Sequence, residues 1–146
     1  TPDFAVRYVA KVVSANPLRY DGDLEPLRPA HSTSIGQVLL AALAPAELDD
    51  YLAHHALERA DGRPPLSERT LRRVLAQARA DGYVTIADSH VAGTSGVAAP
   101  VTTAERTIAG LALIAPTARF DAARHRIVPR VVAAARDLSR AMGGSA

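Results

Sequence analysis

Cysteine is absent from this sequence of 146 residues. Its absence excludes disulfide bonds, thiolate metal sites and a cysteine nucleophile together, and it fits a reducing compartment, so we expect a cytoplasmic protein. No apolar run approaches the roughly 20 residues that a helix needs to cross a bilayer. The opening residues Thr1-Pro2-Asp3 also lack the charged and apolar segments of a secretory signal. We therefore expect no membrane partner.

Blocks of positive charge are missing as well. The 17 basic residues exceed the 15 acidic ones by a formal net charge of only +2, although the isoelectric point is about 9.4. Lys11 is the only lysine, and the arginines are spread along the chain. Proteins that bind nucleic acid usually gather their basic residues in a patch or stripe. The sequence therefore does not predict DNA binding by this chain itself.

The motifs of the common enzyme classes are also lacking. No GxGxxG, Walker loop or HExxH occurs. Gly93-Thr94-Ser95-Gly96 lacks the spacing of a serine nucleophile elbow, so we interpret it as a turn. The five histidines are His31, His54, His55, His90 and His125. No two of them have the i, i+4 spacing of a helical metal site with a carboxylate nearby. We therefore predict no catalytic residue, no metal and no cofactor, and we expect that the protein is not an enzyme.

The hydrophobic pattern predicts one α+β domain. The length suffices for a single core, and elements are expected in the order β, α, α, α, β, β, β, α. Strands that follow one another through short turns favour an antiparallel sheet with helices packed on its faces. The expected strands are 4–14, 83–87, 97–102 and 107–114, and the expected helices are 35–43, 45–55, 67–82 and 121–142, with Ile127, Val131, Ala135, Leu138 and Met142 on the buried side of the last helix.

The turn from His31 to Gly36 is the strongest candidate for a binding site. Ser32, Thr33 and Ser34 precede an apolar helical pattern, so free main-chain N–H groups lead into a helix N-terminus. Such an end binds carboxylate or phosphate, with about 0.3–1 kcal/mol from the helix dipole and up to ~2 when partly buried. Ordinary helix capping explains the same residues, and on these residues alone it is the simpler interpretation.

Several segments, taken in order, resemble one known family. A family stretch PLHxTxxGKxxLA corresponds here to residues 29–41, and RxxGY corresponds to residues 79–83. A Gly followed by AAPV matches Gly93 and residues 98–101, a small-residue strand ends at Pro116, and AAxxxSxxxG matches residues 134–143. In order and spacing the chain is similar to the C-terminal effector-binding domain of IclR-family transcriptional regulators, named after the isocitrate lyase regulator.

The resemblance implies a GAF-like fold, effector binding, and assembly into a homodimer or homotetramer. Residues 1–146 would form the effector-binding domain, with its first strand clipped because Phe4 already lies on an expected strand. Operator DNA would be read by an N-terminal winged helix-turn-helix domain that this sequence lacks. The partners implied are therefore a small carboxylate effector, a second copy of the chain, and DNA only through the missing domain.

The resemblance also implies a site. In the family, main-chain amides at the start of the first helix hold the effector's carboxylate, here at Ser34 and Ile35, flanked by Thr33 and Gly36. Members that bind glyoxylate or pyruvate carry Asp, Cys and two Ser on the facing strands, where this chain has Ile86, Gly96, Ala112 and Ile114. Ile86, Ala112 and Ile114 would leave the polar groups of a keto acid unpaired, at about 1–3 kcal/mol per group, and Gly96 would add room. We therefore expect an acid with an apolar or aromatic body, with Ser95, His31, Ser32 and Arg79 as further polar contacts.

The leading interpretation is thus the ligand-sensing domain of a transcriptional regulator. A small enzyme on a GAF-like scaffold is one alternative, although oxidoreductases of that scaffold use cysteine. Turnover of an ester, amide or keto acid that is lost on mutating Ser95 or His31 would favour it. A dimerisation module with a vestigial pocket is another alternative, which a stable oligomer with no ligand response and a filled cavity would support.

Overall fold

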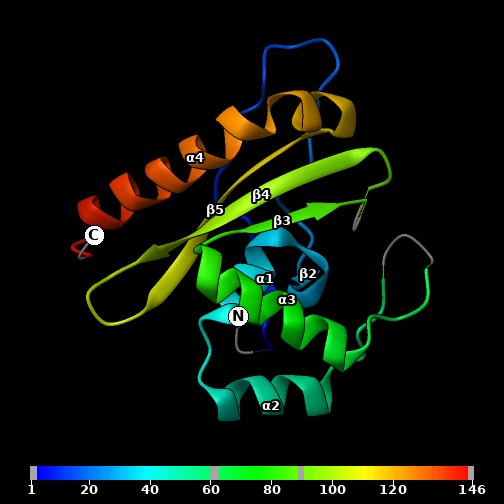
Figure 1. Ribbon diagram of the computed structural model, residues 1–146, viewed down its shortest axis with the longest axis vertical. Coiled ribbons are helices and arrows are strands. Elements are labelled where there is room, and N and C mark those ends of the chain that lie inside the picture. The colour runs from blue at the N-terminus through cyan, green and yellow to red at the C-terminus, as the bar shows by residue number, and fades with distance from the viewer. Residues whose placement is uncertain (1–2, 60–62, 89–90, 145–146) are drawn as a thin grey trace.

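The computed structural model describes residues 3–59, 63–88 and 91–144. It is an α+β fold with two antiparallel sheets and helices in the predicted order (Figure 1). His90, one of the histidines considered above, lies outside the described part. The elements are β1 (Ala5–Val6), β2 (Arg28–Pro29), α1 (Ser34–Ala41), α2 (Pro45–His54), α3 (Glu68–Asp81), β3 (Val84–Ala87), β4 (Thr94–Thr102), β5 (Thr107–Pro116) and α4 (Thr117–Ala141), with a short 3-10 turn (Ala30–Ser32) before α1.

The larger sheet has the strand order β3-β4-β5, and helices cover both of its faces. α4 lies along one face, while α1 packs against the other, and α3 contacts α1 and β3 (Figure 1). β4 serves both layers because its side chains alternate. Ala98 faces the α1 layer, whereas Val97, Ala99 and Val101 join the core beneath α4.

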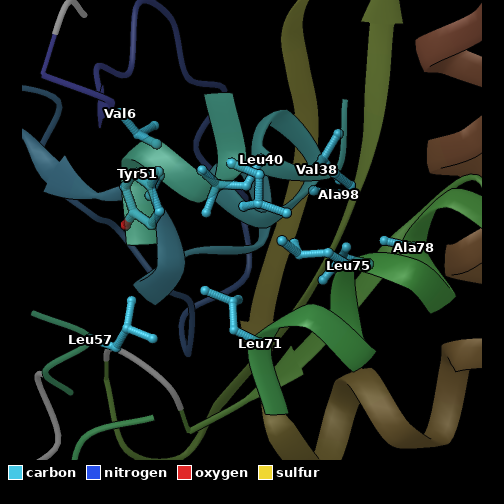
Figure 2. Close-up of a cluster of buried hydrophobic side chains, with 13 residues drawn as sticks. Val6, Val38, Leu40, Tyr51, Leu57, Leu71, Leu75, Ala78 and Ala98 are labelled. Atoms are coloured by element: carbon cyan, nitrogen blue, oxygen red, sulfur yellow. The ribbon is translucent and has the colours of Figure 1, made fainter. Parts of the chain in front are cut away.

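The core on the α1 side joins the three short helices. Tyr51 of α2 and Leu71 and Leu75 of α3 are completely buried there, beside Leu40 of α1 (Figure 2). Val6 of β1 belongs to the same cluster. Phe4, Val6 and Tyr8 therefore pack against the core formed by α1 and α2, which matters for the site described below.

Local sequence explains how α1 begins. The side chain of Thr33 accepts a hydrogen bond from Gly36 N at 2.9 Å, so Thr33 is the N-cap. Gly36 is required by packing, because a Cβ at this position would lie 2.1 Å from the carbonyl oxygen of Ala30. The same rules place Pro45 in the first turn of α2 and Gly82, at φ +75°, at the end of α3.

Two expectations about the elements were wrong. The predicted strand 4–14 is reduced to Ala5–Val6, and the chain beyond it has no regular structure, with Val9 85% and Val12 100% exposed. Apolar β-branched residues favour a strand, but within the described residues no strand pairs with this segment. The last helix starts four residues earlier than expected, and its outer end turns Leu138 and Met142 toward solvent, while Ser139 is buried instead.

Candidate functional site

A small cavity of about 30 Å³ lies between the N-terminus of α1 and the larger sheet. Its floor is a row of cross-strand neighbours, since Ile86 pairs with Gly96 and Gly96 pairs with Ile114. A Cβ on Gly96 would lie 3.1 Å from Leu113 O and 3.2 Å from Ile114 Cγ1. Glycine at this position therefore keeps the floor flat and the two isoleucines accessible from the α1 side.

The N-terminus of α1 forms one wall of this cavity, through Thr33 and Ser34. Gly36 N already donates to the Thr33 side chain, and Gln37 N donates to the Thr33 carbonyl oxygen. Ser34 and Ile35 are the first two residues of the helix, so their N–H groups have no acceptor within it. The helix dipole adds partial positive charge at the same point. This end of α1 is therefore suited to an anion.

Another part of the lining comes from residues 7–28, the first segment of the chain, through Tyr8, Tyr20 and Arg28. The Arg28 Cζ atom lies 6.0 Å from the centre of the Tyr8 ring, within the range of a cation–π contact. Of the described lining residues, Arg28 is the one with a positive charge. Burial raises the pKa of Tyr8, and its hydrogen bond with Thr33 partly offsets that rise. Tyr8 therefore stays a neutral phenol at physiological pH.

Sequence reasoning did not find these three residues. Tyr20 lies beside the turn residues Asp21-Gly22-Asp23, and Arg28 precedes the helix motif, and neither belongs to a pattern that indicates a binding site. Their positions depend on the antiparallel pairing of Val6 with Arg28, which folds the first segment back beside α1. Pairing between strands of two residues leaves no periodic signal in a sequence.

The predicted site residues do not all lie at this cavity. Thr33, Ser34, Ile86, Ser95, Gly96 and Ile114 line the cavity together. Ile35 packs beside Gly110, and Ala112 packs against the core on the α1 side, so their side chains serve packing. Arg79 lies at the other end of α1, where its Nε donates to Ala41 O at 2.6 Å.

His31 and Ser32 lie beside a second cavity, and His31 is fully engaged. Its Nε2 lies 2.8 Å from Glu58 O, which only accepts, so Nε2 carries the proton. Nδ1 must then accept from the Tyr51 hydroxyl at 2.7 Å. Burial lowers the pKa of His31, in agreement with a neutral ring. In this structure both ring nitrogens are occupied, so His31 does not act as a base toward Ser95, whose Oγ is 3.0 Å from Thr117 Oγ1.

The described residues offer neither a metal site nor a membrane-spanning helix. They contain no group of three or more His, Cys, Asp or Glu side chains that could hold a metal ion. In that part of the chain, no helix combines the length and the apolar character needed to cross a membrane.

Comparisons with known proteins give a consistent result. A family model described as "Bacterial transcriptional regulator IclR C-terminal" matches residues 3–140. The chain is 36% identical over 117 residues to the HTH-type transcriptional regulator XynR of Escherichia coli (strain K12), covering 79% of this chain and 46% of that protein. It thus spans less than half the length of the curated relatives it matches.

Solved structures agree in fold. The C-terminal domain of the E. coli transcriptional regulator KdgR has a TM-score of 0.78 at 30% identity, covering 97% of this chain and 82% of that one. The inducer-binding domain of the PobR transcription factor from Acinetobacter, a double mutant in complex with 3-hydroxybenzoic acid, has a TM-score of 0.74 at 27% identity, covering 85% of this chain and 73% of that one.

Proposed function

Because this chain belongs to the IclR family of bacterial transcriptional regulators and matches their C-terminal domain, we propose that it binds a small carboxylic acid and thereby modulates DNA binding by the full-length protein. The acid has an apolar or aromatic body. The full-length regulator acts in the cytoplasm, as a homodimer or homotetramer, and contacts operator DNA through a separate N-terminal winged helix-turn-helix domain.

The observation that carries this proposal is the position of Arg28. Its side chain and the start of α1 line the same small cavity. A carboxylate between them would accept hydrogen bonds from the amides of Ser34 and Ile35 and from the guanidinium. Hydrogen bonds to charged groups contribute about 1.5–3 kcal/mol each, more than neutral ones.

The floor of the cavity supports an apolar body for the ligand. Ile86 and Ile114 offer no hydrogen bond, so a ring or alkyl chain would lie on them without leaving polar groups unpaired. Tyr8, Tyr20 and Ser95 supply hydroxyl groups around that surface. The PobR domain was solved with a hydroxybenzoic acid, a ligand of this kind.

Ligand entry requires the first segment to move. One water needs about 10–15 Å³ of cavity volume, so a cavity of about 30 Å³ is too small for an aromatic acid. The wall formed by Tyr8, Tyr20 and Arg28 is the part with little regular structure, since residues 7–27 contain neither helix nor strand. A ligand would therefore stabilise a form with this wall displaced. A change in DNA binding then follows if the two forms differ in their assembly.

Binding, and not catalysis, fits the groups around the cavity. The hydroxyl of Ser95 is paired with Thr117, and the ring of His31 is held by Tyr51 and Glu58. The relatives that the chain matches are named as transcriptional regulators.

Calorimetry with benzoate, 3-hydroxybenzoate and glyoxylate tests this proposal. We expect the two aromatic acids to bind at least tenfold more tightly than glyoxylate. Arg28→Leu should weaken benzoate binding by about 10- to 100-fold, which is the effect of losing about 1.5–3 kcal/mol. Arg73→Leu, on the exposed side of α3, is the matched control and should bind as the wild type does. Equal affinity of the wild type and Arg28→Leu would refute the carboxylate site.

A further inference from the structure

The positive charge of this protein is concentrated in α4. The helix carries six arginines and two aspartates, a formal charge of +4, whereas the whole chain carries only +2 with neutral histidines. The rest of the chain therefore has a formal charge of −2. In the sequence these arginines look dispersed, because they lie two to six residues apart. The helix decides on which side each of them lies.

Five of the six arginines lie on one side of α4. Consecutive residues of a helix are about 100° apart around its axis, so these five fall within a sector of about 120°. Phe120, Val131 and Ala135 are buried on the opposite side, where α4 packs on β4 and β5 (Figure 1). All five arginines are exposed, and we call them the arginine stripe: Arg119, Arg126, Arg130, Arg136 and Arg140.

The middle of the stripe has no partner in the protein. Arg126, Arg130 and Arg136 make no hydrogen bond or ion pair with another residue in the described part of the chain. Asp137 is the acidic residue on this side of α4, and it already pairs with Arg140. Arg126 and Arg130 are one turn apart, and like charges at that spacing repel each other. A bound anion would relieve this repulsion.

The surface between the arginines is low and open. The other residues exposed along the stripe are small: Ala122, Pro129 and Ala133. Neither of the two cavities is lined by a residue of α4. From residue 126 to residue 140 the helix rises about 21 Å, the length of about six base pairs of duplex DNA. The stripe therefore fits an extended polyanion better than a small anion that needs to be enclosed.

Among extended polyanions, duplex DNA fits this helix best. A helix that binds a membrane inserts its apolar side into the lipid, but the apolar side of α4 is buried against the sheet. Arginine pairs well with phosphate, and a basic stripe along a helix is typical of nucleic-acid binding. A DNA-binding regulator also keeps its effector domain close to a duplex. This last step rests on the DNA binding proposed above, and not on the carboxylate site.

We propose that the arginine stripe of α4 binds the phosphate backbone of duplex DNA without reading its sequence. The contact adds to the one made by a helix-turn-helix domain, and it lies outside the base pairs that such a domain reads. Because contacts with phosphate release counterions from the DNA, this binding depends strongly on salt.

Fluorescence anisotropy with a short labelled duplex of arbitrary sequence tests the proposal on the chain of 146 residues alone. Three phosphate contacts give a slope of about −2.7 in log K against log salt, so the Kd should rise about 40-fold between 50 and 200 mM NaCl. Combining Arg126→Gln, Arg130→Gln and Arg136→Gln should weaken binding at the lower salt concentration at least tenfold and remove most of this slope.

A second triple variant separates the position of the charges from their number. Arg69→Gln, Arg73→Gln and Arg106→Gln lower the net charge by the same amount at exposed positions outside α4. This variant should bind DNA within threefold of the wild type. Equal weakening by the two triple variants would overturn the proposal, because net charge alone would then explain the binding.

The wild-type chain and one single variant keep the test decisive if the α4 triple variant does not fold. Arg130→Gln removes one phosphate contact and should reduce the slope by about 0.9. The proposal is also overturned if the wild-type chain does not bind the duplex at 50 mM NaCl. Binding to phosphatidylserine vesicles or to polyglutamate as tight as binding to DNA would overturn it in favour of a membrane or an acidic protein.

Discussion

Gly36 lies so close to the turn before α1 that a larger residue would push the two apart. A Cβ at this position would lie 2.1 Å from Ala30 O and 2.4 Å from Ala30 Cα, and backbone atoms cannot give way as a flexible side chain would. Gly36→Ala should therefore lower the free energy of unfolding by about 3 kcal/mol, the upper end of the range for overpacking. Urea denaturation measures this change.

Gly82→Ala is the matched control for that prediction. Gly82 has open space around its Cα but a φ of +75°, so Ala costs only the left-handed conformation, about 1–2 kcal/mol. If Gly36→Ala were no more destabilising than Gly82→Ala, the close contact with Ala30 would not limit this position.

His31 should make stability depend on pH. Burial lowers its pKa in the folded protein below the ordinary value of 6.5, so the unfolded chain binds more protons near that pH. The stability from the neutral ring is present above about pH 6.5 and is lost as the pH falls below it. Urea denaturation at pH 7.5 and 5.5 should show a smaller loss in His31→Gln than in the wild type.

His125→Gln provides the control for the pH series. His125 is exposed on α4, so this variant should keep the wild-type change in stability between the two pH values. A wild-type pH dependence in His31→Gln would mean that other groups cause it.

Single residues also show where sequence reasoning succeeds and fails. Thr33 and Ser34 were predicted as site residues because hydroxyl residues followed by a helical apolar pattern indicate the start of a helix. Ile86 and Gly96 were expected because they match pocket positions of related regulators, and both line the same cavity. Tyr8 and Arg28 were not found, because nothing local indicates that the first segment crosses over the start of α1.

Ser139 connects two elements, α4 and the end of β4. Its Oγ accepts from Thr102 N at 2.9 Å and donates to Ala135 O at 2.8 Å, and the residue is buried. Ser139→Ala leaves the Thr102 amide without this acceptor, so we expect a loss of about 1–3 kcal/mol in the free energy of unfolding. Ser14→Ala, at an exposed position, should change it by less than about 0.5 kcal/mol. Equal effects of the two variants would contradict a link through Ser139.

Among the elements, the helices were the easiest to predict. α2 and α3 have clear start and stop residues, and their observed limits differ by a residue or two from those expected. The predicted strand 4–14 was too long because residues of high β-propensity form a strand only beside a partner strand. Arg28–Pro29 pairs only with Ala5 and Val6. The prediction that Leu138 is buried was wrong for a similar reason. Leu138 continues the apolar pattern of α4, but it lies beyond the part of the core that could bury it.

In the whole molecule, the first segment should respond to the ligand. Trypsin sites at Arg7, Lys11 and Arg19 lie in the stretch without regular structure, while Pro29 protects the bond after Arg28. Because an acid bound at Arg28 contacts the wall formed by this segment, saturating benzoate should change the cleavage rate at these three sites by at least threefold. Mass spectrometry of the timed digest measures the rates.

Arg106 gives an internal reference for the digest. It is exposed in the turn between β4 and β5, away from the residues that line the first cavity, and its cleavage should not depend on benzoate. Equal changes at Arg106 and in the first segment would indicate a general effect on stability and not a movement of the wall.

The small volume of the first cavity has a consequence for time as well as for affinity. An acid that binds as proposed displaces Tyr8, Tyr20 and Arg28, so the rate at which these residues move would limit its exchange and its residence time. A sensor with a long residence time averages the metabolite concentration over that period. Brief fluctuations in supply would then pass without a transcriptional response, whereas a sustained change would be registered.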